Sequence, residues 1–255
     1  MRHFFILLVH ELRMLAVSTA TYIAAVLFLV MMGFFYFYVL FQYDHQPETD
    51  LPSTTYFECF WVPVFFVVPL LTMKSLAEER RHGTLEALLT TPSTTLEIVM
   101  GKFCAAYILY AAFWALSLLY PVIAHEYLPI GRTDPRLIEP ASLMGGYLFV
   151  LVSGLLYIAL GIFASSVTRD TLVAGMLGFS LVFALIVSGW LMKDLHLQDS
   201  SLAWLQPTLD YFNTFRQLED FARGIVDTRM FFLYASNTLL VLGLTTLTVE
   251  ARATA

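Results

Sequence analysis

Residues 143–167 read LMGGYLFVLVSGLLYIALGIFASSV, an unbroken run without a charged side chain. A helix of about 20 apolar residues crosses the roughly 30 Å hydrocarbon core of a bilayer. This run therefore predicts a membrane-spanning helix, and five further runs along the chain meet the same test. They are residues 17–41, 57–73, 103–124, 171–192 and 230–249. We expect an all-α polytopic membrane protein with six transmembrane helices.

The overall composition agrees with a lipid environment. Of the 255 residues, 58% are hydrophobic and 13% are charged, and the mean hydropathy is +0.72. A soluble globular domain carries about 25% charged residues. We therefore treat residues 1–255 as a single transmembrane domain in contact with membrane lipid, with no nucleic-acid partner. The apolar start of the chain is interrupted by HELR at 10–13, before it reaches the length of a signal-peptide core, so we expect it to be retained.

The second run, 57–73, is the shortest of the six and contains Pro63 and Pro69. Proline removes a backbone donor and interrupts a helix, and neighbouring helices then satisfy the freed groups. We expect this span to be kinked.

Lysine and arginine decide the orientation of the chain. An even number of spans places both termini on one side of the membrane, together with the polar stretch between the second and third spans. This side holds eight of the 14 Lys and Arg residues, Lys102 included. The first loop on the opposite side, 42–56, holds none. Positive residues in short loops mark the cytoplasmic side. We therefore place both termini and the 74–101 loop in the cytoplasm.

The six expected spans lack chemical machinery. They contain no Lys, Arg, Asp or His, and Glu58 lies at the outer edge of one of them. Ion-coupled transporters and intramembrane enzymes use ionisable or nucleophilic groups at membrane depth. The chain has no phosphate-binding loop of the G-x-x-x-x-G-K-[ST] type, and its six His and two Cys residues form no metal-ligand spacing. We expect no catalytic, cofactor-binding or metal-binding residues, and no enzyme activity by this chain itself.

A polar stretch separates the second and third spans: residues 74–102, KSLAEERRHGTLEALLTTPSTTLEIVMGK. Ser75 and Glu78 have the spacing of a capping box, in which a hydroxyl and a carboxylate satisfy free N–H groups at a helix start. Gly83 is placed to end that short helix. A second capping-box spacing, TTLE at 94–97, predicts the start of the helix that leads into the third span.

A short amphipathic helix is predicted between these two helices. Thr84 is placed to cap it, Glu86 lies in its first turn, where the helix dipole favours an acid, and Pro92 ends it. The leucines that share one face are Leu85, Leu88 and Leu89. Two interpretations are open: the leucines enter lipid at the membrane interface, or the helix docks in a groove of a cytoplasmic partner. The lack of machinery elsewhere in the chain favours the partner.

The outer segment 193–229 contains a second amphipathic helix, at about 208–224. Its apolar residues recur at helical spacing and are Phe212, Phe215, Leu218, Ala222 and Ile225. Glu219 and Arg223 form an i,i+4 pair, and Gly224 is placed to end the helix. We expect this helix to pack at the outer interface or to cover the end of a transport path.

The stretch AEERRHGTLEALLTTPSTTLEIVMGKF at 77–103 resembles the signature cytoplasmic loop of type-2 ATP-binding-cassette (ABC) transporter permeases. The positions that match the family pattern are Glu78, Glu79, Gly83, Thr84, Leu85, Glu86, Leu88, Leu89, Pro92, Gly101 and Lys102. Residues 210–240 resemble the last outer loop and sixth span of the branch that includes gliding-motility permeases and permeases of copper-enzyme maturation. The six-span plan agrees as well, so the resemblance covers essentially the whole chain.

The resemblance implies a type-2 ABC exporter fold. In that fold residues 1–16 form an interfacial elbow helix, residues 74–101 form the coupling loop, and 193–229 supply the outer amphipathic helix. It also implies that the coupling residues contact a separate ATPase subunit, which binds ATP and Mg²⁺ and performs hydrolysis. Those residues are Glu78, Glu79, Gly83, Thr84, Leu85, Glu86, Leu88, Leu89 and Pro92. The family assembles as two permeases and two ATPases, with the translocation path between the permeases.

Two other classes of function stay open at this point. In the first, the chain is an ATP-independent channel or secondary transporter, and its 74–101 loop lies only at the membrane interface. In the second, it is a membrane scaffold subunit that transports nothing. The loop motif carries no information on the substrate.

Overall fold

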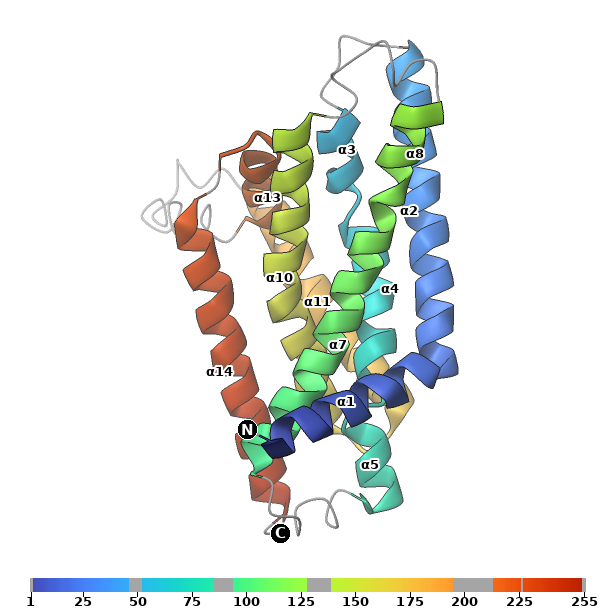
Figure 1. Ribbon diagram of the computed structural model, residues 1–255. Coiled ribbons are helices and arrows are strands. Elements are labelled where there is room, and N and C mark those ends of the chain that lie inside the picture. The colour runs from blue at the N-terminus through green and yellow to red at the C-terminus, as the bar shows by residue number, and fades with distance from the viewer. Residues whose placement is uncertain are drawn as a thin grey trace, which may run out of the picture.

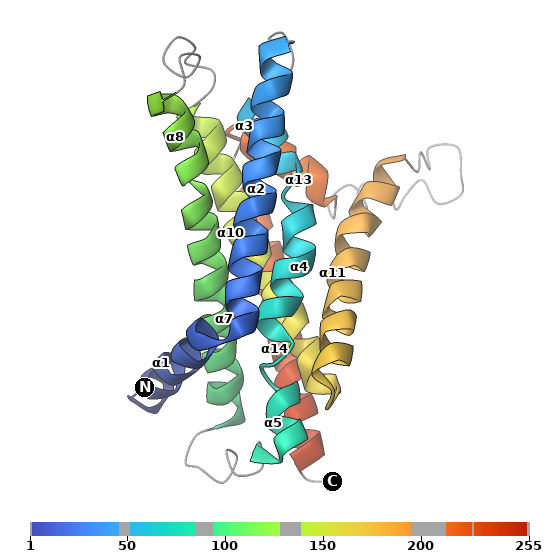
Figure 2. The same cartoon turned by 90° about the vertical axis from the view of Figure 1, so that its right-hand side faces the viewer.

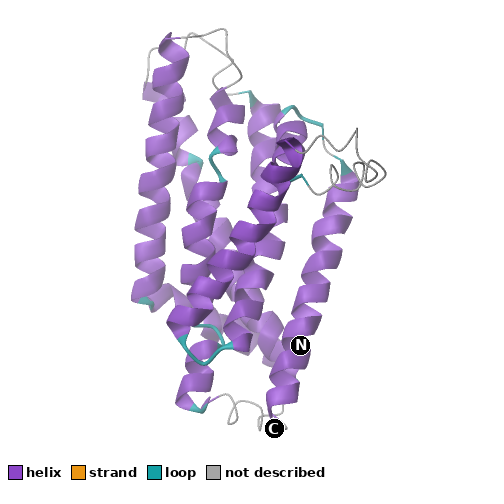
Figure 3. Cartoon of the chain, turned by 180° about the vertical axis from the view of Figure 1, so that it is seen from behind, coloured by secondary structure: helices purple, strands orange, loops and turns teal. Residues whose placement is uncertain are grey.

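In the computed structural model the described residues form helices joined by short loops and turns, with no strand among them (Figure 3). Those residues are 2–45, 52–84, 94–127, 139–194, 213–225 and 227–253. Within them, six helical segments are long and apolar enough to cross a membrane: Thr19–Tyr43, Trp61–His82, Thr95–Tyr127, Pro140–Val167, Thr171–Gly189 and Thr228–Ala251. The predicted all-α fold class and the predicted count of six spans are confirmed.

The helices follow one another along the chain and are labelled in Figure 1. They are α1 (Arg2–Val17), α2 (Thr19–His45), α3 (Pro52–Glu58), α4 (Trp61–Thr72), α5 (Ala77–His82), α7 (Thr95–Ser117), α8 (Leu119–Tyr127), α10 (Pro140–Val167), α11 (Thr171–Asp194), α13 (Thr214–Ala222) and α14 (Thr228–Ala253). Helix α1 lies across the end of the bundle where α5 and the C-terminus are found (Figure 1). We call this the terminal end, and the end with α3, α8 and α13 the far end.

Helix α10 is the centre of the bundle. It packs against α4, α7, α11, α13 and α14. In its most apolar stretch of 18 residues, 72% of the residues are buried. Glycines make these close contacts possible, because a Cβ added at Gly154 would overlap the Tyr110 ring and one added at Gly161 would overlap Thr72. Small residues at helix interfaces allow such close approach in membranes, where burial of apolar surface gives little drive for association.

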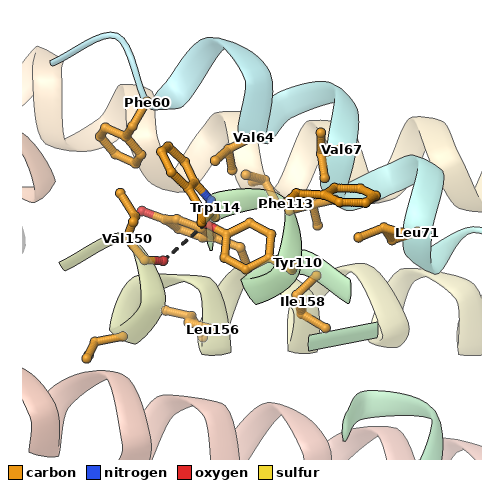
Figure 4. Packing of buried hydrophobic residues seen from close by; sticks show 14 of the residues in the cluster. Phe60, Val64, Val67, Leu71, Tyr110, Phe113, Trp114, Val150, Leu156 and Ile158 are labelled. Carbon is orange, nitrogen blue, oxygen red and sulfur yellow. Dashed lines mark hydrogen bonds between the residues drawn. The ribbon is translucent and has the colours of Figure 1, made fainter. Parts of the chain in front are cut away.

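Aromatic and aliphatic side chains of α4, α7 and α10 interlock in the core beside these glycines (Figure 4). Phe60, in the turn just before α4, and Leu71 of α4 are fully buried, as is Tyr110 of α7. The Tyr110 hydroxyl donates a hydrogen bond to the carbonyl oxygen of Val150 on α10 at 3.1 Å. The ring of Trp114 meets the Phe28 ring of α2 edge-on at 5.1 Å between centroids, so the first span is joined to the same core.

Proline accounts for the breaks within the second and third spans. The expected second span, 57–73, is divided into α3 and α4, with a break at residues 59–60, ahead of Pro63; Pro69 lies inside α4. The third span breaks between α7 and α8 because Pro121 has no N–H to donate to the carbonyl of Ser117. The second span also runs further than expected, since the charged helix α5 continues it to residue 82.

At the far end, α13 lies against α10, α3 and α11. The Asn213 side chain accepts hydrogen bonds from the N–H groups of the first turn, and Gly224, with φ of +78°, follows the helix. Leu218 and Ala222 face the core, as their spacing predicts, and Phe221, which was not on the predicted face, is buried beside them. Ile225, expected on the same face, is 60% exposed because the chain has already turned away. Phe212 and the start of the expected 208–224 helix lie outside the described residues.

We expect Gly154→Ala to destabilise the bundle, while Gly243→Ala, its matched control, does not. A Cβ at 154 must displace the Tyr110 ring, whereas a Cβ at 243 meets nothing within 4 Å. Overpacking typically costs about 1–3 kcal/mol, and both substitutions gain the same helix propensity. Thermal unfolding in detergent would therefore show a lower Tm for Gly154→Ala alone; equal Tm values for the two variants would contradict this packing.

Candidate functional site

The polar stretch that starts at Lys74 contains α5, which lies at the terminal end (Figure 2). Gly83 follows α5 with φ of +70°, and its N–H donates to the carbonyl of Arg80 at 3.4 Å. A left-handed backbone at this position favours glycine. The predicted end of the helix at Gly83 is confirmed.

The helix after the stretch also starts as predicted. The N–H of Glu97 donates to the Thr94 hydroxyl at 3.3 Å, and the N–H of Thr94 donates to the Glu97 carboxylate at 3.2 Å. This reciprocal pair is the capping box that TTLE predicts, and it launches α7.

The predicted capping box of Ser75 and Glu78 is wrong. Helix α5 begins after Leu76, one residue later than that box requires, and no side chain of its own segment caps it. The N–H groups of Leu76 and Ala77 instead donate to the hydroxyl of Ser165 on α10, at 3.0 Å each. Because Ser165 satisfies these donors, the start of α5 is fixed to the end of α10.

A second set of polar contacts ties α5 to α10 and, through it, to α14. The Arg80 guanidinium donates to the carbonyl oxygen of Ser166, the residue after the capping serine. The hydroxyl of Ser166 in turn hydrogen-bonds to the hydroxyl of Thr248 on α14 at 3.1 Å. The short helix therefore cannot shift without affecting two of the spans.

A buried lysine joins α5 to two other helices. Lys102 of α7 is 2% exposed, and its ammonium Nζ lies 2.7 Å from Glu11 Oε1 of α1 and 2.6 Å from Glu79 Oε1 of α5. We call these three residues the Lys102 ion triad. Burying an ammonium is costly unless it is paired and hydrogen-bonded, so the two carboxylates are what allows Lys102 to occupy this site.

The triad lines an open cleft of about 540 Å³ between α1, α5 and the start of α7. Other lining residues are His10, Lys74, Glu78, His82 and Thr84. The hydroxyl of Thr84 donates to the backbone carbonyl of Glu79 at 3.2 Å. Of the predicted ATPase-contact residues, the structure thus brings Glu78, Glu79 and Thr84 to one cleft, with Gly83 between them in sequence.

The remaining predicted contact residues lie outside the described part of the chain. They are Leu85, Glu86, Leu88, Leu89 and Pro92. The amphipathic helix expected there, and the cap expected from Thr84, stay predictions.

Three residues of the site were not identified from the sequence. In the sequence, Glu11 is only part of the polar HELR break at 10–13, and Ser165 and Ser166 are only residues of a predicted membrane span. Each is distant in sequence from the residue that it contacts: 91 positions separate Glu11 from Lys102. Only the folded bundle brings these residues together.

The polar side chains of the site connect helices to one another. The site holds carboxylates, an ammonium and hydroxyls in fixed hydrogen bonds, and the described residues contain no group of three His, Cys, Asp or Glu side chains that could hold a metal ion. One short helix, α5, is anchored to α1, α7 and α10 at the end of a membrane bundle.

A family comparison places this architecture. The model of the ABC-2 family of transporter proteins matches residues 41–247. The chain belongs to the ABC-2 transporter family. This assignment confirms the resemblance that the 77–103 stretch carries, and together with the six spans it makes the chain a multi-pass membrane protein of that family.

Similar proteins agree with the family. The chain is 28% identical over 155 residues to the probable multidrug ABC transporter permease YbhR of Escherichia coli strain K12, and equally to YbhR of Escherichia coli O157:H7. The aligned part is 59% of this chain and 39% of each relative. This ABC-2 family chain thus spans about two fifths of the curated relatives that it matches.

We expect Ser165→Ala to loosen α5 without unfolding the bundle. Loss of a helix cap costs about 1 kcal/mol, so amide hydrogen exchange at Leu76 and Ala77 should accelerate about fivefold. The control is Ser180→Ala, which removes an exposed hydroxyl bonded only within α11. Unchanged exchange at Leu76 and Ala77 in Ser165→Ala would show that Ser165 does not hold the helix.

Proposed function

We propose that this ABC-2 family chain is the permease subunit of an ATP-driven transporter and that its 74–101 segment couples it to a separate ATPase subunit. The observation that carries the proposal is the anchoring of α5. The segment begins on the Ser165 cap and the Lys102 ion triad, so a force applied to it by a partner passes directly into α10, α7 and α1. A segment that merely rested on lipid would not need these buried polar anchors.

In the proposed complex the terminal end faces the cytoplasm of a bacterial inner membrane. The distribution of Lys and Arg supports this side. The ATPase binds ATP and Mg²⁺ and performs hydrolysis, while this chain holds no nucleotide. The coupling surface comprises Glu78, Glu79, Gly83 and Thr84, continued by Leu85, Glu86, Leu88, Leu89 and Pro92. The resemblance of 210–240 supports the branch of gliding-motility and copper-enzyme-maturation permeases.

We also assign the translocation path to the junction of two permease copies. An apolar groove of about 430 Å³ runs between α4 and α11, which pack side by side (Figure 2). Phe65, Phe66 and Phe179 line it, and Leu172 and Met176 at its edge are 73% and 70% exposed. The relative YbhR is described as a probable multidrug permease. Export of an apolar or amphipathic compound along this groove fits its lining.

Purified permease alone should hydrolyse no ATP, and co-expression with its ATPase should yield a stable complex with stimulated hydrolysis. Leu88→Ala or Glu86→Ala should lower the stimulation about tenfold, as loss of a central interface contact does, while membrane insertion is unchanged. The control is Tyr127→Ala, a 79% exposed residue at the far end.

Two outcomes would contradict the proposal. Transport by vesicles that lack any ATPase would show an ATP-independent channel or secondary transporter. Full stimulation in both loop variants would show that the 74–101 segment is not the coupling surface.

Cysteine cross-linking tests the proposed junction of two copies. In a Cys59→Ala, Cys104→Ala background, Met176→Cys should form cross-linked dimers in membranes, because α11 faces the second copy. Leu239→Cys on α14 is the matched control, since it is similarly exposed, at 67%, on another side of the bundle. Equal cross-linking of both variants would indicate random collision, and cross-linking of Leu239→Cys alone would move the junction to α14.

A further inference from the structure

The Lys102 ion triad has an imbalance that a simple structural ion pair would not have. Two carboxylates share one ammonium, so the triad carries one excess negative charge. The two carboxylates also differ. The Glu11 side chain is 12% exposed and the Glu79 side chain is 22% exposed, although the second oxygen of Glu79, Oε2, is buried without a hydrogen-bond partner. Glu11 is therefore the enclosed counter-ion and Glu79 the more accessible one.

This difference determines what happens when α5 moves. If Lys102 had only Glu79, any displacement of α5 would leave a buried ammonium unpaired, at a cost of several kcal/mol. Glu11 offsets that penalty, because it lies 2.7 Å from Nζ and belongs to α1, not to α5. The second carboxylate thus permits the α5 contact to loosen and reform while Lys102 remains charged and in place.

Helix α1 packs along α7, and two adjacent contacts in this interface involve Gly101 and Lys102. Leu7 and Glu11 are four residues apart, and therefore lie on one face of α1. Leu7 packs on Gly101, where a Cβ would lie 3.1 Å from Leu7 Cδ2, and Glu11 pairs with the next residue, Lys102. Apolar packing has little directional preference, whereas the ion pair joins two defined atoms, so it contributes the directional part of this interface.

We propose that Lys102 is the positioning residue that links the elbow helix to the coupling segment. Glu11 locks α1 onto α7, and Glu79 forms a reversible contact through which movement of α5 reaches that α1–α7 unit. The consequence for ATP coupling rests on the proposed function. The linkage itself does not, and it can be measured separately.

The distance between Leu7 and Gly101 allows a direct measurement. A Cβ at position 101 would lie 3.9 Å from Leu7 Cβ, within the range of about 3.5–4.5 Å that a disulfide requires. Leu7→Cys with Gly101→Cys, in the Cys59→Ala, Cys104→Ala background, should therefore cross-link α1 to α7 under mild oxidation, and the rate of cross-linking reports how firmly Glu11 holds α1.

Three isosteric variants separate the two arms of the triad. Glu11→Gln and Lys102→Met should slow the cross-linking about tenfold because they remove a buried charge pair that holds α1. Glu79→Gln should change it less than about twofold, since the Glu11 pair remains. An unchanged rate in Glu11→Gln would overturn the proposal, as would a reduction in Glu79→Gln as large as that in Glu11→Gln. If Lys102→Met fails to fold, the two Gln variants still decide.

Rescue then distinguishes positioning from a general loss of stability. In the complex with the ATPase, Glu11→Gln and Glu79→Gln should each reduce stimulated hydrolysis, and the oxidised 7–101 disulfide should restore only Glu11→Gln. The disulfide replaces the Glu11–Lys102 pair as the link between α1 and α7, but it cannot restore the contact between Glu79 of α5 and Lys102. The double-Cys protein with an intact triad, measured in both redox states, provides the reference activity against which each variant is compared. Restoration of both variants, or of neither, would overturn the proposal.

Failure of the proposed function would look different. If no ATPase binds even the unmodified permease, hydrolysis is absent from every variant. The cross-linking rates then still show whether the triad links α1 to α7.

Discussion

The fold depends on how closely other helices approach α10. Between lipid-facing helices there is little hydrophobic drive for association, so close packing and hydrogen bonds to the backbone must hold the bundle together. Two tyrosines of α7 make this visible: Tyr107 and Tyr110 donate to the successive carbonyls of Leu151 and Val150 at 3.0 and 3.1 Å. Gly154 provides the space in which the Tyr110 ring lies. A larger residue there would separate α7 from α10 and remove both the contacts and the hydrogen bonds.

The sequence predicts the parts of this fold whose causes are local. Six apolar runs are recognisable because span length is set by bilayer thickness. The end of α5 at Gly83 and the start of α7 at Thr94 are predictable because a left-handed glycine and a capping box act within a few residues. These features required no knowledge of neighbouring helices.

The interactions that were not predicted are those between distant parts of the chain. The cap of α5 comes from Ser165, and the local signal of Ser75 and Glu78 was misleading because a nearby spacing cannot reveal a competitor 89 positions away. Glu11 likewise meets Lys102 only after α1 has folded across α7. In the candidate site, the sequence thus identifies Glu79 and Lys102 as residues of the family pattern. It does not reveal that they pair with each other, or that Lys102 also pairs with Glu11 of α1.

The same helix connects the two ends of the molecule. Gly145 at the far end of α10 lies so close to α13 that an added Cβ would overlap the carbonyl of Phe221, and Ser165 at the terminal end caps α5. These positions are 20 residues apart, or about 30 Å of helix, which is the thickness of the hydrocarbon core. Neither contact leaves space for an independent shift, because one is backbone against backbone and the other is a pair of hydrogen bonds. Under the proposed function, a displacement of α5 by an ATPase is therefore transmitted along α10 as a rigid element. At the far end, α10 packs against α13 and α3, so these two helices receive the displacement.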